Sequence, residues 1–188
     1  MYYWRITKYD PQNRDENGLY KKDEWISIGG IGKKFEGVEL TYEEYIRYEN
    51  AYVDAVIRVM RENNVESLRI KPLQKNSYVT YDDFPEPETK NFYKSLKTNT
   101  MIPMNDIAKV VRFALRKEIW CKLASDKMFV HFGYDYYMFI GSENRSDEMI
   151  NAIINNGLFV ENFISPYLPD AIYNKLIKKL KLVRGDKT

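Results

Sequence analysis

The strongest constraint in this sequence is the regular spacing of apolar residues over positions 41–63. Apolar side chains recur there at steps of three and four residues, which is the period of one helix face. Thr41 followed three residues later by Glu44 has the spacing of a capping box, and Asn63 suits a helix exit. The segment therefore predicts a long amphipathic helix with this apolar stripe: Tyr42, Tyr45, Ile46, Tyr52, Val53, Val56, Ile57 and Met60.

One charged residue, Glu49, falls on this apolar stripe. A carboxylate in such a position must be paired with a buried donor or must hold its proton more tightly than it would in water. We expect Glu49 to be largely buried and hydrogen-bonded. A carboxylate that holds its proton is also a candidate acid for hydrolysis, if a second carboxylate lies nearby in space.

The composition limits the classes of protein to consider. The chain has 188 residues, 44% of them hydrophobic, which is enough for a packed core. Its net charge of +2 argues against a dedicated nucleic-acid binder, whose domain would be strongly basic. The first residues do not resemble a signal peptide, and no apolar run is long enough to span a membrane. We expect a cytoplasmic protein without membrane contact.

Sequence patterns predict an α+β fold, with a mixed, largely antiparallel sheet packed against several amphipathic helices. A single domain over 1–188 is expected, although prolines near 85–103 leave room for a subdivision. Strands are predicted at 2–9, 66–73, 77–81, 128–140 (a hairpin) and 158–165, with further helices at 89–99, 105–123, 146–156 and 169–182. The predicted core contains Trp4, Ile6, Val53, Val56, Val130, Phe132, Met138 and Ile153.

An acidic, proline-containing segment at 82–88 is the first candidate for partner binding. It cannot be a helix interior or a central strand, because it contains two prolines. It is either a solvated connector or a charged loop that docks on a basic partner. The candidate binding residues are Asp82, Asp83, Phe84, Glu86 and Glu88, with Phe84 as an apolar anchor between the acidic pairs.

The loop of the predicted hairpin supplies a second candidate surface. Tyr134, Tyr136 and Tyr137 lie close together there, and tyrosine is a frequent anchor at protein interfaces.

Two basic helix faces carry the alternative hypothesis of nucleic-acid association. Lys109, Arg112 and Arg116 share one face of the helix predicted at 105–123, and lysines line the outer face of the helix predicted at 169–182. Such faces are usually only solvated. The glycines at 29, 30 and 32 resemble a phosphate-binding loop, but the Gly-Lys pair lacks the Ser or Thr of that motif.

Catalytic chemistry has little support in the sequence. His131 is the only histidine and lies in an aromatic strand, where a structural role is expected. Cys121 is the only cysteine and is expected near the end of a helix. No spacing suggests a metal site or a cofactor.

Four segments of the first third of the chain resemble a small family of uncharacterised Bacillus-type proteins. They are YWRITKYDP at 3–11, EW at 24–25, IGKKFEG at 31–37 and LTYEEYIRYENAY at 40–52. In type, such small α+β proteins are similar to the immunity proteins of bacterial toxin systems, which block a toxin's active site. The resemblance implies a protein partner and supplies no catalytic motif.

Three functions therefore stand as hypotheses. The first is a protein-binding module, most concretely an immunity protein that neutralises a toxin. The second is a nucleic-acid-associated protein, and the third is a hydrolase that uses Glu49.

Overall fold

The computed structural model describes residues 1–80 and 83–184, with side chains to residue 179. The strands are β1 (Tyr2–Thr7), β2 (Lys34–Phe35), β3 (Val38–Glu39), β4 (Ser67–Lys75), β5 (Met101–Pro103), β6 (Ile119–Ala124), β7 (Met128–Phe132), β8 (Met138–Ser142) and β9 (Phe159–Asn162). The α-helices are α1 (Tyr42–Glu62), α2 (Pro87–Ser95), α3 (Met104–Leu115), α4 (Asp147–Asn155) and α5 (Asp170–Arg184).

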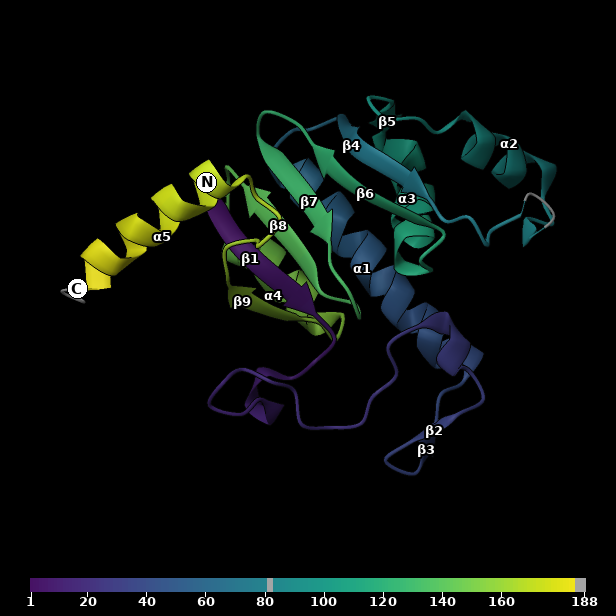
Figure 1. Ribbon diagram of the computed structural model, residues 1–188, viewed down its shortest axis with the longest axis horizontal. Helices are drawn as coiled ribbons and strands as arrows, with labels where there is room; N and C mark the ends of the chain where they lie inside the picture. The colour runs from purple at the N-terminus through teal and green to yellow at the C-terminus, as the bar shows by residue number, and fades with distance from the viewer. Residues whose placement is uncertain (81–82, 185–188) are drawn as a thin grey trace.

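Seven of these strands form one antiparallel sheet in the order β5-β4-β6-β7-β8-β1-β9 (Figure 1). The fold is therefore α+β, as the sequence predicts. The hairpin of β7 and β8 lies near the centre of the sheet, and every residue of both strands is buried. This position explains why their sequence is apolar on both faces. The strands β2 and β3 form a separate small ribbon.

The helices α1, α3 and α4 pack on one face of the sheet, with α1 running along its middle (Figure 1). Two of them begin at a side-chain cap, because the hydroxyl of Thr41 accepts from the Glu44 amide and that of Ser146 accepts from the Met149 amide. All eight predicted core residues are buried in one cluster between the helices and the sheet: Trp4, Ile6, Val53, Val56, Val130, Phe132, Met138 and Ile153. This part of the prediction is confirmed.

The other face of the sheet is covered in its centre by the segment 163–168. His131 lies there, stacked on Phe129 with ring centroids 4.4 Å apart. Its Nδ1 is 2.8 Å from the hydroxyl of Ser165, and the Tyr167 ring meets it edge-on. His131 thus holds the covering segment in place, which is the structural role expected for it.

The helix predicted at 105–123 is wrong in its second half. The helix α3 ends at Leu115, Lys117 turns the chain with a φ of 62°, and β6 begins at Ile119. Within β6, Ile119, Cys121 and Leu123 are buried and alternate with more exposed residues. That alternation has the period of a strand, and its apolar members also fit a helix extended from α3. Cys121 therefore lies in a strand, where burial raises the pKa of its thiol to about 12.

Two shorter predictions between α1 and α3 also need correction. The segment 77–81 does not form the second strand of a hairpin; residues 77–80 form a turn and loop, and residue 81 lies outside the described part of the chain. Instead β4 continues to Lys75 and pairs with β5 and β6, with a register shift between Ile70 and Leu73 that accommodates Pro72. The residues between the helices predicted at 89–99 and 105–123, for which no strand is predicted, contain the edge strand β5.

The C-terminal helix forms where predicted, but it does not pack as predicted. It leaves the sheet beside the N-terminus and extends away from the rest of the molecule (Figure 1). None of its side chains from 170 to 179 is buried, and Ile172 is 48% exposed. The amphipathic spacing of this helix predicts that Ile172, Tyr173, Leu176 and Ile177 face the core; this prediction is wrong, because none of the four is buried.

Candidate functional site

Glu49 sits at the centre of a buried ion-pair cluster between α1 and α3. Its side chain has no exposed surface. Arg116 donates to both carboxylate oxygens, from Nε over 2.7 Å and from Nη2 over 2.8 Å. The hydroxyl of Tyr45 donates to Oε1 over 3.0 Å, and Nε of Arg112 lies 3.3 Å from Oε2. The prediction of a buried, hydrogen-bonded Glu49 is confirmed.

Two tyrosine hydroxyls extend the cluster towards the β7–β8 hairpin. Tyr136 donates to the Tyr45 hydroxyl over 2.9 Å, and the backbone carbonyl of Tyr136 accepts from Tyr52. Tyr52 in turn accepts from the Lys8 amide at the end of β1. Burial raises the pKa of Tyr45, Tyr52 and Tyr136, so all three remain protonated donors. The chain of bonds ties α1, α3, β1 and the hairpin together.

This arrangement is that of a structural ion pair. Both oxygens of Glu49 are engaged by donors from the same chain, which leaves the carboxylate no oxygen directed at a substrate. The geometry therefore gives the hydrolase hypothesis no support.

The basic face of α3 is neutralised by the rest of the chain. Arg112 and Arg116 both turn to Glu49, and Arg112 also donates to the side chain of Asn50. Lys109 pairs with Asp106 and Glu88 over 3.0 and 3.1 Å. These charges hold α3 against its neighbours, so the face has little left to offer a nucleic-acid phosphate.

A second carboxylate, Glu118, lies in the turn between α3 and β6. Within the described part of the chain, its Oε2 is buried without a hydrogen-bond partner. Burial raises the pKa of the Glu118 carboxyl to about 7; Arg116 opposes the rise, while Glu49 and Asp83 add to it. A partly protonated carboxyl near neutral pH results from this desolvation.

We expect Glu118→Gln to stabilise the protein at pH 8 and to leave it unchanged at pH 4. The pKa of Glu118 in the folded state lies above its unfolded value of 4.5. Below pH 4.5 the protonated carboxyl costs the folded state nothing, and as pH rises from 4.5 through 7 its ionisation lowers the free energy of unfolding. After allowance for solvent screening, the gain at pH 8 is about 1–2 kcal/mol. Urea unfolding at both pH values measures it. An equal effect of the variant at pH 4 and pH 8 would contradict the assignment.

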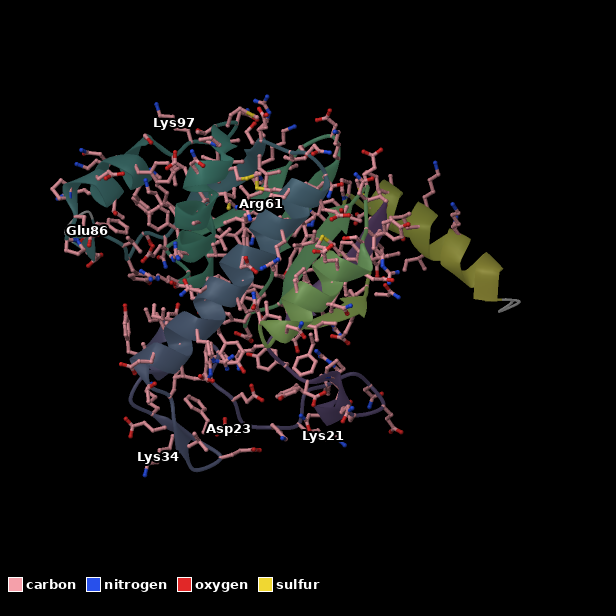
Figure 2. All side chains as sticks on the ribbon, turned by 180° about the vertical axis from the view of Figure 1, so that it is seen from behind. Lys21, Asp23, Lys34, Arg61, Glu86 and Lys97 are labelled. Atoms are coloured by element: carbon pink, nitrogen blue, oxygen red, sulfur yellow. The ribbon has the colours of Figure 1, made fainter. Side chains whose placement is uncertain are left out.

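The acidic segment proposed for partner binding is only partly available. Asp82 lies outside the described residues. Asp83 is exposed, but its carboxylate accepts from the amide and the hydroxyl of Thr80. Glu86 lies at the outer edge of the molecule (Figure 2), and Glu88 is exposed beside Lys109.

Phe84 does not have the position expected of an apolar anchor. It is only 7% exposed and packs on Tyr93 and Phe113, with ring centroids 4.7 and 5.5 Å away. Its ring fixes the acidic segment to α2 and α3, so it cannot enter a partner's pocket without leaving its own core. The prediction for Phe84 is wrong because sequence shows its acidic neighbours and not the aromatic rings that cover it.

The three tyrosines of the hairpin loop fall into three different environments. Tyr134 is 79% exposed. Tyr136 is buried in the Glu49 cluster, which corrects its assignment to a binding surface. Tyr137 is half-buried, packs against Tyr9 with the two rings tilted by 34°, and accepts from Arg14 over 3.0 Å. Of the three, Tyr134 alone presents its ring to solvent.

Tyr134 lines a groove of about 610 Å³ where the ends of β4, β6 and α3 meet the hairpin. We call this the aromatic groove; it is lined by Gln74, Lys75, Asn76, Ser77, Ala114, Lys117, Ile119, Trp120, Phe132, Gly133 and Tyr134. Trp120 is 39% exposed on the sheet face away from the helices. Sequence reasoning missed Trp120 because it placed this residue in a helix. The alternation of residues 119–123 was the signal that pointed to an outward-facing tryptophan.

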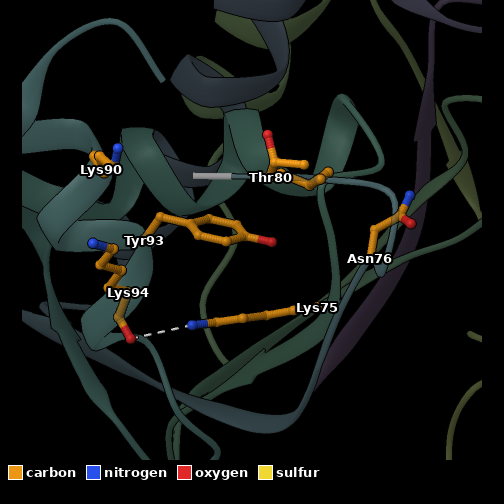
Figure 3. A pocket seen from close by; sticks show the side chains of 7 residues that line it. Lys75, Asn76, Thr80, Lys90, Tyr93 and Lys94 are labelled. Carbon is orange, nitrogen blue, oxygen red and sulfur yellow. Dashed lines mark hydrogen bonds between the residues drawn. The ribbon is translucent and has the colours of Figure 1, made fainter. Parts of the chain in front are cut away.

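A second cavity, of about 480 Å³, lies between the end of β4 and α2 (Figure 3). Lys75 extends into it and donates to the carbonyl of Lys94 over 3.2 Å, with its amine 4.9 Å from the Tyr93 ring centroid. Burial and the nearby charge of Lys97 lower the pKa of Lys75. Asn76 donates to the Lys117 carbonyl. The first bond holds β4 against α2, and the second holds the end of β4 against the turn between α3 and β6.

The glycine-rich segment at 28–32 does not form a phosphate-binding loop. Gly30 is buried, and a Cβ there would lie 3.2–3.3 Å from the side chains of Trp25, Phe35 and Leu40. The segment packs against Trp25, whose ring also faces the buried ammonium of Lys8 at 4.2 Å. Gly30 thus allows close packing of the connection that precedes α1, and Gly32 allows a turn with a φ of 80°.

No group of three or more metal-ligating side chains lies together in the part of the chain that the structure describes. Over the same residues, no helix combines the length and the apolar character needed to cross a membrane. Comparison of the chain with protein-family models, with curated proteins and with solved structures finds no match to any of them.

Proposed function

We propose that this protein is a non-catalytic, cytoplasmic protein-binding module of the immunity type, which neutralises a partner by covering its active site. The observation that carries the proposal is the aromatic groove. Trp120 and Tyr134 stand exposed on its walls, although burial of aromatic rings is strongly favoured. Tyr78, 90% exposed, lies one residue beyond Ser77 of the lining.

Exposed aromatic rings around a concave surface are typical of interface hot spots. Tryptophan and tyrosine supply large contact areas at low cost in conformational entropy, and they dominate binding energy where they are found. Lys117 and Asp135, 3.7 Å apart, lie at the rim and can orient a partner through polar contacts. A protein loop or helix end that inserts an apolar side chain fits such a groove.

The acidic residues have a secondary part in this proposal. Asp83 and Glu86 are exposed on the segment that precedes α2, and Glu88 is exposed in the first turn of α2. Rim charges of this kind chiefly alter the association rate and its salt dependence. We assign them to steering of a basic partner, and we assign binding energy to Trp120 and Tyr134.

The proposal is tested by co-expression with the products of the adjacent genes, one of which is expected to be toxic alone and harmless with this protein. The double variant Trp120→Ala/Tyr134→Ala should lose protection and raise the dissociation constant of the purified pair at least 30-fold, because two hot-spot rings are removed. The matched control is Tyr42→Ala, which removes an exposed tyrosine, 58% exposed, at the start of α1.

Neutralising Asp83, Glu86 and Glu88 together should slow association and flatten its salt dependence, with little change in melting temperature.

Failure of every adjacent gene product to form a complex would contradict the immunity role. Equal affinity of the double variant and the unmodified protein would contradict the groove as the interface.

A further inference from the structure

The basic charge of this protein is concentrated at its C-terminal end. Residues 170–188 contain six basic and two acidic residues, whereas residues 1–169 contain 23 basic and 25 acidic residues. The body of the molecule is therefore slightly acidic, and the net charge of +2 conceals a strongly basic helix. This asymmetry points to an anionic counterpart for α5 itself.

The described side chains of α5 are sorted into two faces. At about 100° per residue, Ile172, Tyr173, Leu176 and Ile177 fall within an arc of roughly 140°. The remaining arc carries Asn174, Lys175, Lys178 and Lys179, and Lys179 borders the apolar residues. In sequence, Leu180 and Val183 continue the apolar spacing to the end of the helix.

The rest of the chain does not bury the apolar face of α5: Ile172 is exposed, and Tyr173, Leu176 and Ile177 are only half-buried. The helices α1, α3 and α4 each bury their apolar stripe against the sheet, whereas α5 projects away from it (Figure 1). An isolated helix of this length is marginal in water, so an uncovered amphipathic helix gains stability from a surface that takes its apolar face.

We propose that α5 lies on anionic lipid surfaces, with its apolar face in the headgroup boundary and its lysines directed at the lipid charges. This surface contact replaces the expectation, drawn from the sequence, of a protein without membrane contact. The charge pattern of α5 supports an anionic lipid surface as its binding partner. A lysine-rich face opposite a continuous apolar arc is the arrangement of interfacial helices, in which both the burial of apolar area and electrostatic attraction contribute to binding. Lysines that border the apolar arc can extend their ammonium groups to the headgroup level.

Two other binding partners, a nucleic acid and a second copy of α5, fit the two faces of the helix less well. A nucleic acid would engage the lysines but would leave Ile172, Leu176 and Ile177 in water. A second copy of α5 would cover the apolar face, but helix axes 8–10 Å apart place both lysine-rich helices within about one screening length of each other. An anionic bilayer is the counterpart that accommodates both faces at once.

The experiment uses the full chain and sedimentation with vesicles of phosphatidylcholine alone or with about 30% phosphatidylserine. We expect at least tenfold stronger partitioning onto the anionic vesicles, weakening as salt rises. The variant Lys178→Gln/Lys179→Gln should reduce partitioning about 25-fold, since each lysine near an anionic surface contributes about fivefold. The variant Leu176→Asp/Ile177→Asp should abolish it.

Matched controls keep the result interpretable. Lys33→Gln/Lys34→Gln removes two exposed lysines from another part of the surface, and Ile154→Asp charges an exposed isoleucine of α4; both should bind like the unmodified chain. The α5 variants should have the same melting temperature as the unmodified protein, because α5 buries none of its described side chains in the core.

Three results would overturn the proposal. The first is equal partitioning, or none, onto both kinds of vesicle. The second is binding to a mixed-sequence RNA or DNA that depends on the lysines and not on Leu176 and Ile177. The third is a concentration-dependent dimer, seen by analytical ultracentrifugation, that the Leu176→Asp/Ile177→Asp variant dissolves, because that result would assign the apolar face to a second copy.

Discussion

Replacing Glu49 by alanine is expected to lower the free energy of unfolding by about 3–5 kcal/mol. The substitution removes a carboxylate without exposed surface and leaves Arg116, a raised-pKa guanidinium held by that carboxylate, beside a cavity without its partner. Tyr45 loses its acceptor at the same time. Chemical denaturation of the variant and the unmodified protein at pH 7 measures the difference.

A conservative substitution and a double-mutant cycle separate the ion pair from the loss of volume. Glu49→Gln keeps the shape and should cost about 1–3 kcal/mol, since the hydrogen bonds weaken and the charge is lost. The cycle of Glu49→Ala with Arg116→Ala should show a coupling energy of about 1–3 kcal/mol. Additive effects of the two substitutions would mean that the pair does not act as a unit. Arg58→Ala, in an exposed pair on α1, serves as a control with an effect below about 1 kcal/mol.

Acidification is expected to destabilise the protein through His131. Burial, with the neighbouring Lys122 as a second cause, lowers the pKa of His131 to about 3, whereas the unfolded chain binds this proton near 6.5. Between these values the unfolded state binds the proton and the folded state does not, so stability falls as pH drops from 6.5 towards 3. The full effect is roughly 3–5 kcal/mol.

The measurement is the pH dependence of the free energy of unfolding in the unmodified protein and in His131→Gln. The variant should be less stable at pH 7, because it loses the stacking on Phe129, yet its stability should fall less steeply between pH 6.5 and 4. The carboxylates contribute equally to the pH dependence of both proteins, so their contribution cancels when the two curves are subtracted. Glu118→Gln is a control that should change the curve in the opposite direction. Protonated Glu118 stabilises the unmodified protein on acidification, so the variant, which lacks this gain, should lose stability more steeply as pH falls. Parallel curves for His131→Gln and the unmodified protein would show that His131 is not held neutral.

The reliable predictions from sequence concern segments whose pattern is local and has one interpretation. For α1, the cap at Thr41 and the spacing of its apolar residues predict the helix that forms from Tyr42 to Glu62. The same pattern identifies Glu49 as a charged residue on a buried face, since it falls between Tyr45 and Tyr52. Neither inference requires knowledge of what covers the helix.

The predictions that failed concern segments whose pattern has two interpretations or whose environment is distant. Residues 119–123 fit both a helix and a strand, and the pairing of β6 between β4 and β7 decides between them. Phe84 reads as an exposed anchor beside its acidic neighbours, yet Tyr93 and Phe113 cover it. Trp120 and Tyr134 lie in one groove because the sheet brings together β6, which the sequence predicts as a helix, and the loop of the predicted hairpin.

The sequence by itself determined which residues of each helix are apolar, where α1 and α4 begin, and that Glu49 requires a buried partner. Tertiary structure alone decided that this partner is Arg116, 67 residues away, and that the β7–β8 hairpin adds Tyr136 to the same cluster. It also decided that α5 leaves its apolar face open. The physical reason is that hydrophobic periodicity records which face of an element avoids water, whereas the identity of the covering surface depends on how distant elements are packed.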